Sequence, residues 1–393
     1  MKAIVLSGGG SKGSYQIGVW KALRKLRIKY DIVTGTSVGA LNGALMTQGN
    51  FHRALKVWKS INLKTLFGED AEESENTIEV FKMYKDNFIK NGGMEVKDLE
   101  KLIDENINKK KFYSSKVNFG LITMNLDTIK PLIVKKNDIA KEKLTDYLVA
   151  SASCFPVFQK KEINNQNYID GGYYDNLPIN LAIELGADEI IAVDLKAPGI
   201  KRKPTKKIPT ITIKPNNKLT NFLNFYEEGT KKNIKYGYND TMKAFGKLEG
   251  NNYTFKKNTI KKNIKKYSET WKYLIDKTID KNLLTSLIKK IYKIDSKKEN
   301  KEIGIVLLKI MEDLGKEFNI DDTKIYSKRK FNKLIKKNFK TKVKYYEMKN
   351  EEDKIIEIYK NMKNKNKKKL KKDILLSSKE FFKALYLCTI EED

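Results

Sequence analysis

The glycine-rich turn near the start of the chain is the feature that most constrains its fold. Lys2–Ser7 has the apolar core of a buried strand, and Gly8–Gly13 follows it directly. From Ser14 onward the apolar residues recur at helical spacing. A second apolar run, Ile32-Val33, leads into another helical stretch, Val38–Met46. This alternation of short strands and helices predicts a parallel sheet with helices on its faces.

Later segments continue the same pattern. Val117–Met124 and Glu189–Asp194 have the composition of buried strands, and Thr210–Ile213 is expected to be the last strand of the sheet. Helical spacing is found in Glu95–Asn108 and in Leu181–Leu185. We therefore expect an α/β fold whose central sheet is mainly parallel.

Charge divides the chain into two parts. The 393 residues include 79 basic and 49 acidic side chains, which gives a formal net charge of +30. Residues 1–200 contain 28 basic and 24 acidic side chains, whereas the remaining 193 residues contain 51 and 25. Beyond about residue 255 the composition turns to Lys, Asn and Ile with helical periodicity. We predict an α/β domain over residues 1–255 and a basic, mainly helical region over residues 256–393.

Two scarce residue types exclude several kinds of chemistry. The chain has one histidine, His52, and two cysteines, Cys154 and Cys388, which form no CxxC pair. A histidine-built or cysteine-built metal site and a disulfide scaffold are therefore excluded, and neither a metal nor a cofactor is expected. The apolar run at the start is too short for a signal peptide, and no stretch approaches the ~18 apolar residues of a membrane-spanning helix. We expect a cytoplasmic protein.

The first motif, between a strand and a helix, is Gly8-Gly9-Gly10-Ser11-Lys12-Gly13. Its G-x-G-x-x-G spacing also fits a dinucleotide-binding turn, but that turn requires an acidic residue at the end of the second strand, where Gly35-Thr36-Ser37 stands. A Walker P-loop fails because no GK[ST] follows. Two interpretations remain. The glycines either serve only a tight turn, or their N–H groups hold an anion, such as the oxyanion of an ester under attack.

The second motif is Gly35-Thr36-Ser37-Val38-Gly39, a G-x-S-x-G sequence where a strand meets a helix. Such an elbow exposes the serine hydroxyl at the helix N-terminus, where the helix dipole favours developing negative charge. The alternative is a serine that only caps the helix. A nucleophilic serine also needs a base, and His52 lies in a helical stretch away from any strand end. We expect His52 to be structural.

The third motif, Asp170-Gly171-Gly172, offers a different base. Glycines after an aspartate let the backbone pass close to another element while the carboxylate points into a cleft. The carboxylate can take the serine proton directly if burial raises its proton affinity. The alternative is an Asp-Gly turn between two strands. We expect Cys154 to be a core residue and Asp194 to be structural.

In this order, the three motifs resemble the signatures of patatin-like phospholipases. The likeness continues through Ala150–Phe158 and Asn176–Leu195, and Gly237–Met242 fits the close of such a domain, so the resemblance covers roughly residues 1–255. Two departures are visible, because DGG stands where DGA is also common and Cys154 stands where small residues are usual. The resemblance implies a three-layer fold around a mainly parallel sheet. It also implies an enzyme with a Ser-Asp dyad, which would explain the single histidine.

The resemblance assigns a role to each motif. Ser37 would be the nucleophile and Asp170 the general base, supported by Gly35, Gly39, Gly171 and Gly172. The oxyanion hole would be formed by the backbone of the first motif, whose members are Gly8, Gly9, Gly10, Ser11, Lys12 and Gly13. The N–H groups of Gly9 and Gly10 are the main candidates, with Ser11 as a third. Ser37 would attack an ester carbonyl while Asp170 takes its proton, and water would then release the fatty acid.

Two hypotheses from different classes follow. The first is a serine acyl hydrolase that acts on lipids or phospholipids. The second is an inactive scaffold whose basic C-terminal half binds anionic membrane or nucleic acid. A lysine-rich, arginine-poor composition suits sequence-specific base reading badly, so no specific nucleic acid is expected. Stretches such as Leu283–Lys293 place apolar residues beside lysines at helical spacing. They indicate either peripheral contact with an anionic membrane or a helical domain packed on its own core.

Overall fold

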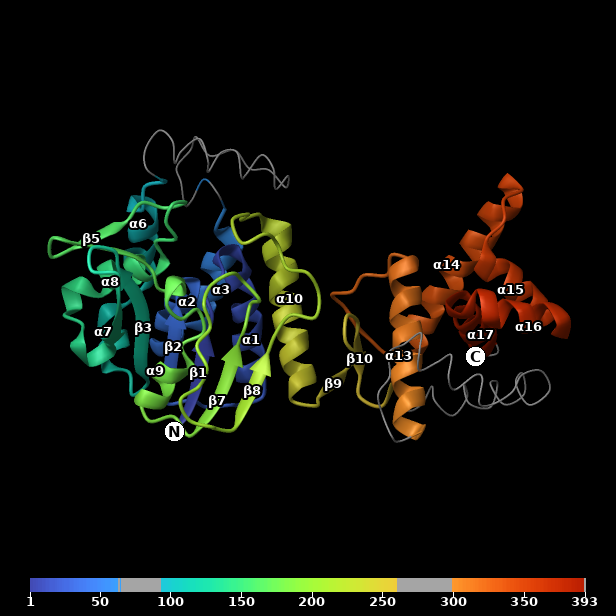
Figure 1. The fold of residues 1–393 in the computed structure, drawn as a ribbon, viewed down its shortest axis with the longest axis horizontal. Helices are drawn as coiled ribbons and strands as arrows, with labels where there is room; N and C mark the ends of the chain where they lie inside the picture. The colour runs from blue at the N-terminus through green and yellow to red at the C-terminus, as the bar shows by residue number, and fades with distance from the viewer. Residues whose placement is uncertain (63, 65–92, 260–298, 392–393) are drawn as a thin grey trace. The chain divides into compact units, whose positions relative to one another are not determined.

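The computed structural model describes residues 1–62, 64, 93–259 and 299–391. Contacts divide the chain into two units, Met1–Ala244 and Phe245–Asp393, and Figure 1 shows the elements of each. The division falls before residue 255, the boundary expected from composition, because Tyr253 and Phe255 belong to the hydrophobic core of the second unit. The stretch Leu283–Lys293 lies outside the described residues.

The first unit is built around a mixed sheet. Its strands are β1 (Lys2–Leu6), β2 (Ile32–Thr36), β3 (Asn118–Asn125), β4 (Lys130–Lys135), β5 (Lys161–Ile163), β6 (Gln166–Asp170), β7 (Glu189–Val193) and β8 (Thr210–Ile213). Their order is β5-β6-β3-β2-β1-β7-β8, and β4 pairs with β3. The neighbours from β3 through β2, β1 and β7 to β8 run parallel, whereas β4, β5 and β6 pair antiparallel.

Helices cover both faces of this sheet. The helices described in the first unit are α1 (Ser14–Lys25), α2 (Val38–Thr47), α3 (Phe51–Ser60), α6 (Lys97–Asn106), α7 (Lys109–Ser114), α8 (Leu144–Ala152), α9 (Ile179–Glu184) and α10 (Glu227–Ala244). Gly43 of α2 lies against Val33, whereas the next residue along the strand, Ile32, packs with the residues of α9. Because neighbouring side chains of a strand point to opposite faces, α2 and α9 lie on opposite sides of the sheet. Figure 1 shows α10 running alongside α1.

The predicted architecture is confirmed. The expected strands Val117–Met124, Glu189–Asp194 and Thr210–Ile213 correspond to β3, β7 and β8, and the layers are helix, mainly parallel sheet and helix. The sequence analysis did not predict β4, β5 and β6. β5 and β6 are short and carry polar residues, so they lack a continuous apolar core, whereas β4 contains the apolar run Leu132–Val134, which the sequence analysis did not use.

The second unit is mainly helical over its described residues, as predicted. Its helices are α13 (Glu299–Glu317), α14 (Lys328–Lys349), α15 (Lys354–Lys363), α16 (Lys367–Leu376) and α17 (Ser378–Glu391), beside a small sheet of β9 (Leu248–Glu249), β10 (Thr254–Lys256) and β11 (Ile325–Tyr326). Phe255, Phe331 and Phe382 are fully buried in its core. Of the helices that the structure describes, none combines the length and the apolar composition needed to cross a bilayer.

Candidate active site

Ser37 stands at a sharp turn between β2 and α2. Its backbone angles, φ 56° and ψ −132°, lie in a region that residues other than glycine rarely adopt. Gly39 permits the turn, because a Cβ at that position would collide with the carbonyl oxygen of Leu6. The N–H of Ser37 donates to Ser151 Oγ at 3.0 Å, and the Ser151 hydroxyl donates to the carbonyl oxygen of Ile122 at 2.7 Å. The elbow is therefore fixed by α8 and β3.

Asp170 ends β6 and lies next to this elbow because both are held by the same strand. Thr36, the last residue of β2, is paired with Ile122, and Asp170 is paired with the next residue of β3, Thr123. Asp170 Oδ1 accepts a hydrogen bond from the N–H of Gly172 at 2.7 Å, which fixes the carboxyl group. The second and third motifs, far apart in the sequence, thus meet at one point of the sheet.

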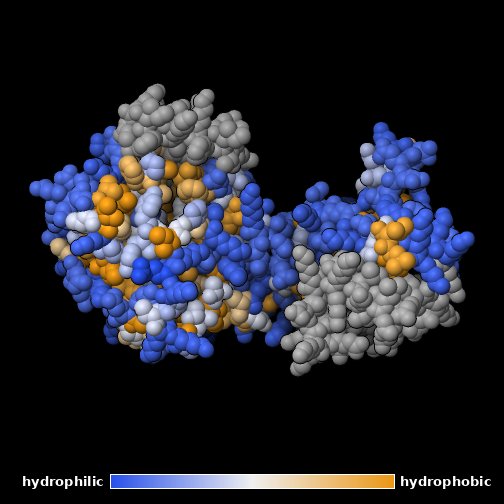
Figure 2. Space-filling model, viewed as in Figure 1, coloured by the Kyte–Doolittle hydropathy of each residue, from blue (hydrophilic) through white to orange (hydrophobic). Residues whose placement is uncertain are grey.

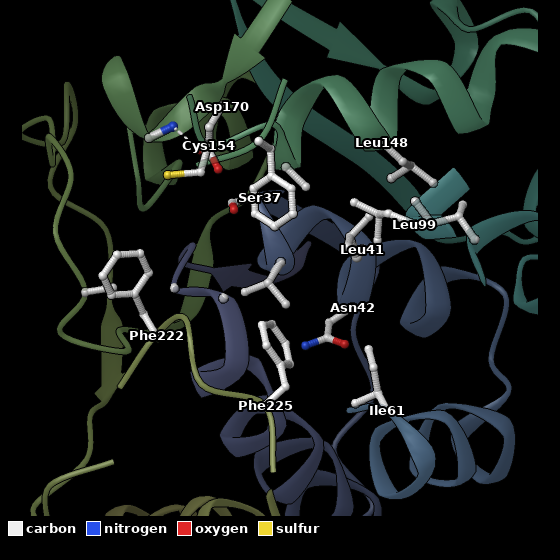
Figure 3. A pocket seen from close by; sticks show the side chains of 18 of the residues that line it. Ser37, Leu41, Asn42, Ile61, Leu99, Leu148, Cys154, Asp170, Phe222 and Phe225 are labelled. Carbon is white, nitrogen blue, oxygen red and sulfur yellow. Dashed lines mark hydrogen bonds between the residues drawn. The ribbon is translucent and has the colours of Figure 1, made fainter. Parts of the chain in front are cut away.

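The surroundings of Asp170 change its proton affinity. Burial raises the pKa of this carboxyl from its usual 3.8 to about 6, while hydrogen bonding to the Ser37 hydroxyl and to the Gly172 N–H lowers it. The residue is 5% exposed. Figure 3 shows the Ser37 hydroxyl beside the carboxyl of Asp170. A carboxyl with this pKa is ionised at neutral pH but accepts a proton more readily than an exposed aspartate does.

Ser37 and Asp170 line a pocket of about 250 Å³. Its wall beyond the serine is mostly apolar and includes Leu45 and Ile103. Leu41, Leu99 and Leu148, which also belong to it, are labelled in Figure 3. Among the described lining residues, Asp170 is the only one with an ionisable acid or base besides the weakly acidic Cys154 and Tyr173. The pocket can therefore hold an extended apolar group with one end at Ser37, whereas its described lining offers a negatively charged group no counter-ion.

Gly9 and Gly10 line the same pocket. Their backbone N–H groups form no hydrogen bond to any residue that the structure describes, so both are free to bind a ligand. Gly10 has φ +54°, and a Cβ there would collide with the carbonyl oxygen of Phe222. The turn thus requires glycine, and it presents two donors beside the serine elbow.

The other members of the first motif are used within the protein. The N–H of Ser11 donates to the carbonyl oxygen of Phe222 at 2.9 Å, and that of Lys12 donates to Gly9 at 3.2 Å. The expectation that Ser11 is a third free donor is therefore wrong in this structure. Lys12 is half-buried, which lowers its pKa, and Gly8, Lys12 and Gly13 do not line the pocket.

Asn176 is a residue of this site to which the sequence analysis gave no role. The N–H of Gly8 donates to its Oδ1 at 3.0 Å and to its backbone oxygen at 3.1 Å, and its Nδ2 donates to the carbonyl oxygen of Pro198 at 2.9 Å. Asn176 is 2% exposed and lines the pocket. It joins the first motif to the turn after β7. The signal available in the sequence was an asparagine six residues after Asp170, directly before Leu177 and Pro178.

Three further residues were considered from the sequence. His52 is exposed on α3 and does not line the pocket. Asp194 forms an ion pair with Lys201 at 2.7 Å. Cys154, which we expected in the core, lines the pocket instead, and burial together with the nearby charge of Asp170 raises its pKa to about 12. A thiol with this pKa is protonated at neutral pH, so Cys154 is a poor nucleophile.

Comparisons with known proteins identify relatives of the first unit. The family model of patatin-like phospholipases matches residues 4–183. Patatin-like phospholipase domain-containing protein 7 of Rattus norvegicus is 28% identical over an alignment of 205 residues, and the match covers 49% of this chain and 13% of that protein. The cUMP-AMP-activated phospholipase of Escherichia coli is 27% identical over an alignment of 214 residues, and the match covers 49% of this chain and 60% of that protein. The match therefore spans only part of each relative.

Among solved structures, VipD from Legionella pneumophila aligns with 99% of this chain and 91% of its own, at 15% identity and a TM-score of 0.42.

The mainly parallel sheet, with a glycine turn after β1 and a serine elbow after β2, is the patatin fold. Residues 4–183 belong to the patatin-like phospholipase family. The resemblance that the three motifs indicated is confirmed.

Proposed function

We propose that the chain is a serine acyl hydrolase that cleaves fatty-acyl esters of lipids or phospholipids. Ser37 is the nucleophile and Asp170 the general base. The observation that carries the proposal is the position of a buried carboxyl beside the Ser37 hydroxyl, both facing one apolar pocket. The family of residues 4–183 supports a lipid ester as the substrate.

In the acylation step, Ser37 Oγ attacks the ester carbonyl carbon and its proton passes to Asp170. The pKa of about 6 supports this role, because a base near the working pH accepts the proton and can return it. The oxyanion that forms accepts hydrogen bonds from the N–H groups of Gly9 and Gly10. Donors fixed at this place stabilise the transition state more than the uncharged ester. Asp170 then protonates the leaving alcohol.

In the deacylation step, a water molecule gives its proton to Asp170 and attacks the acyl group on Ser37. The fatty acid leaves and Ser37 recovers its proton. Throughout both steps the acyl chain lies in the pocket along Leu41, Leu99 and Leu148. Each methylene removed from water there contributes about 0.8 kcal/mol to binding, which favours fatty-acyl esters over short ones.

The proposal is tested with a chromogenic fatty-acyl ester and a fluorophosphonate probe. Ser37→Ala should lower kcat/KM at least about 10³-fold and abolish labelling, and mass spectrometry should find the probe on Ser37 of the wild type. Ser114→Ala, at an exposed serine of α7, is the matched control and should behave as the wild type. Turnover near the wild-type level in Ser37→Ala would overturn the mechanism. An inert wild type would favour the inactive scaffold.

A further inference from the structure

Helix α16 in the second unit turns two leucines toward solvent. Leu370, Asp373 and Ile374 face the core of the unit, where each is at most 5% exposed. Leu375 and Leu376 are 55% and 72% exposed. The described surface of the second unit is otherwise mostly hydrophilic in the view of Figure 2. Leu375 and Leu376 leave more than half of their surface in water, so their placement side by side points to a contact outside the folded unit.

Exposed lysines lie on the same side of the helix. We define the α16 face as Lys368, Lys369, Lys371, Lys372, Leu375 and Leu376, all of which are exposed. Side chains four residues apart are neighbours on a helix, so Lys371 lies next to Leu375 and Lys372 next to Leu376. The α16 face is therefore basic toward its start and apolar at its end.

This arrangement of charge does not serve the stability of α16. The first turn of the helix carries no acidic residue, and its last turn carries no basic one. Lysines near the N-terminus oppose the helix dipole, which favours negative charge there. Lys368 and Lys372 also stand four residues apart, where like charges repel. The lysines of the α16 face thus act against the helix that carries them.

The positive charge of the α16 face is not neutralised within the described part of the chain. The structure gives Lys368, Lys369, Lys371 and Lys372 no ion-pair partner among the described residues. Asp373 is the only acid of the helix, and it points inward, where it pairs with Lys354 at 3.0 Å and accepts a hydrogen bond from Asn361 at 3.2 Å. The α16 face is therefore complementary to a negative partner.

We propose that the α16 face docks the protein on an anionic lipid surface. The lysine ammonium groups contact the lipid phosphates and carboxylates, while Leu375 and Leu376 enter the boundary between headgroups and acyl chains. Lysines beside exposed leucines are the composition of surface-bound helices. The leucines favour lipid over nucleic acid, because only a bilayer offers them an apolar phase. The inference does not depend on Ser37 chemistry, although docking would bring a lipid hydrolase to its substrate.

The experiment measures co-sedimentation of the full chain with vesicles of phosphatidylcholine, with and without phosphatidylserine. Wild type should bind the anionic vesicles and lose binding as salt rises. Two variants should each weaken binding at least about tenfold. One is the triple variant Lys368→Gln/Lys369→Gln/Lys372→Gln, and the other is the double variant Leu375→Ser/Leu376→Ser. Ser37→Ala should bind as the wild type does, so this test and that of the hydrolase mechanism can fail separately.

Matched controls come from α14 of the same unit. Lys333→Gln/Lys337→Gln/Lys340→Gln removes as many exposed charges, and Met348→Ser changes a side chain that is 77% exposed beside Glu347. Both should bind as the wild type. Equal losses in the α14 and α16 variants, or binding indifferent to phosphatidylserine, would overturn the proposal. A labelled oligonucleotide whose binding depends on the α16 lysines but not on the leucines would also overturn it in favour of nucleic acid.

Discussion

Replacing Asp170 by asparagine separates the catalytic role of this residue from its effect on stability. Asparagine has nearly the same shape, and its Oδ1 can still accept the hydrogen bond from Gly172. It cannot take a proton from Ser37 or carry a negative charge in the buried site. We expect Asp170→Asn to lose ester hydrolysis and, at neutral pH, to be more stable than the wild type.

The size of the stability gain follows from the pKa of Asp170. At about 1.4 kcal/mol per pKa unit, a rise from 3.8 to about 6 means that ionising Asp170 costs the folded state up to about 3 kcal/mol. The cost is complete above about pH 6, where the carboxyl is ionised in both states. The cost becomes smaller as the pH falls from about 6 toward 3.8, because over this range Asp170 is protonated in the folded protein but still ionised in the unfolded chain. Asp170→Asn should therefore gain most at pH 8 and almost nothing near pH 4.

Urea unfolding at pH 8, 6 and 4.5 measures this difference in the first unit. Its reporters are Trp20 and Trp58, which are 3% and 5% exposed. A Trp271→Phe background removes the third tryptophan, which lies outside the described residues. In parallel, kcat/KM of the asparagine variant should fall about 10³-fold or more. The kcat/KM of the wild type should decline about tenfold per pH unit below pH 6, because the base must be ionised.

Asp175→Asn is the matched control. Burial also raises the pKa of Asp175 to about 6, although hydrogen bonds from the N–H groups of Leu177 and Arg202 and the charge of Arg202 lower it. Unlike Asp170, Asp175 does not line the pocket. It should gain stability over the same pH range and keep its activity. The reasoning is refuted if Asp170→Asn is destabilised equally at pH 8 and pH 4.5, or if it hydrolyses esters as well as Asp175→Asn.

Two other substitutions test the assignment of the site. His52→Ala should retain activity within about twofold in the ester assay, because the side chain is exposed and does not line the pocket; an inactive variant would reassign the base. Asn176→Ala should lower kcat about tenfold with a smaller change in KM and cost about 1–3 kcal/mol in unfolding free energy, because it removes the side-chain acceptor of Gly8 and the donor to Pro198. Unchanged kcat would show that Asn176 serves only the fold.

The features that depend on local backbone geometry can be predicted from the amino-acid sequence. A strand that enters a glycine turn or a serine elbow needs particular residues at particular places, since a Cβ at Gly10 or Gly39 would collide with a neighbouring carbonyl oxygen. Continuous apolar runs identified the buried parallel strands, because both faces of these strands are covered by helices. The three motifs, their order and the family they indicate were therefore predictable from the chain alone.

Which groups meet, and what each of them can do, depends on how the chain folds in three dimensions. Only the pairing of β2 and β6 with consecutive residues of β3 brings Ser37 to Asp170, and only burial raises the pKa of that carboxyl to about 6. Ser11 and Gly9 look alike as donors in the sequence, but the Ser11 N–H is bound to Phe222, whereas that of Gly9 is bound to no described residue. Proton affinity and hydrogen-bond availability arise from neighbours distant in the chain, so no local pattern of residues can specify them.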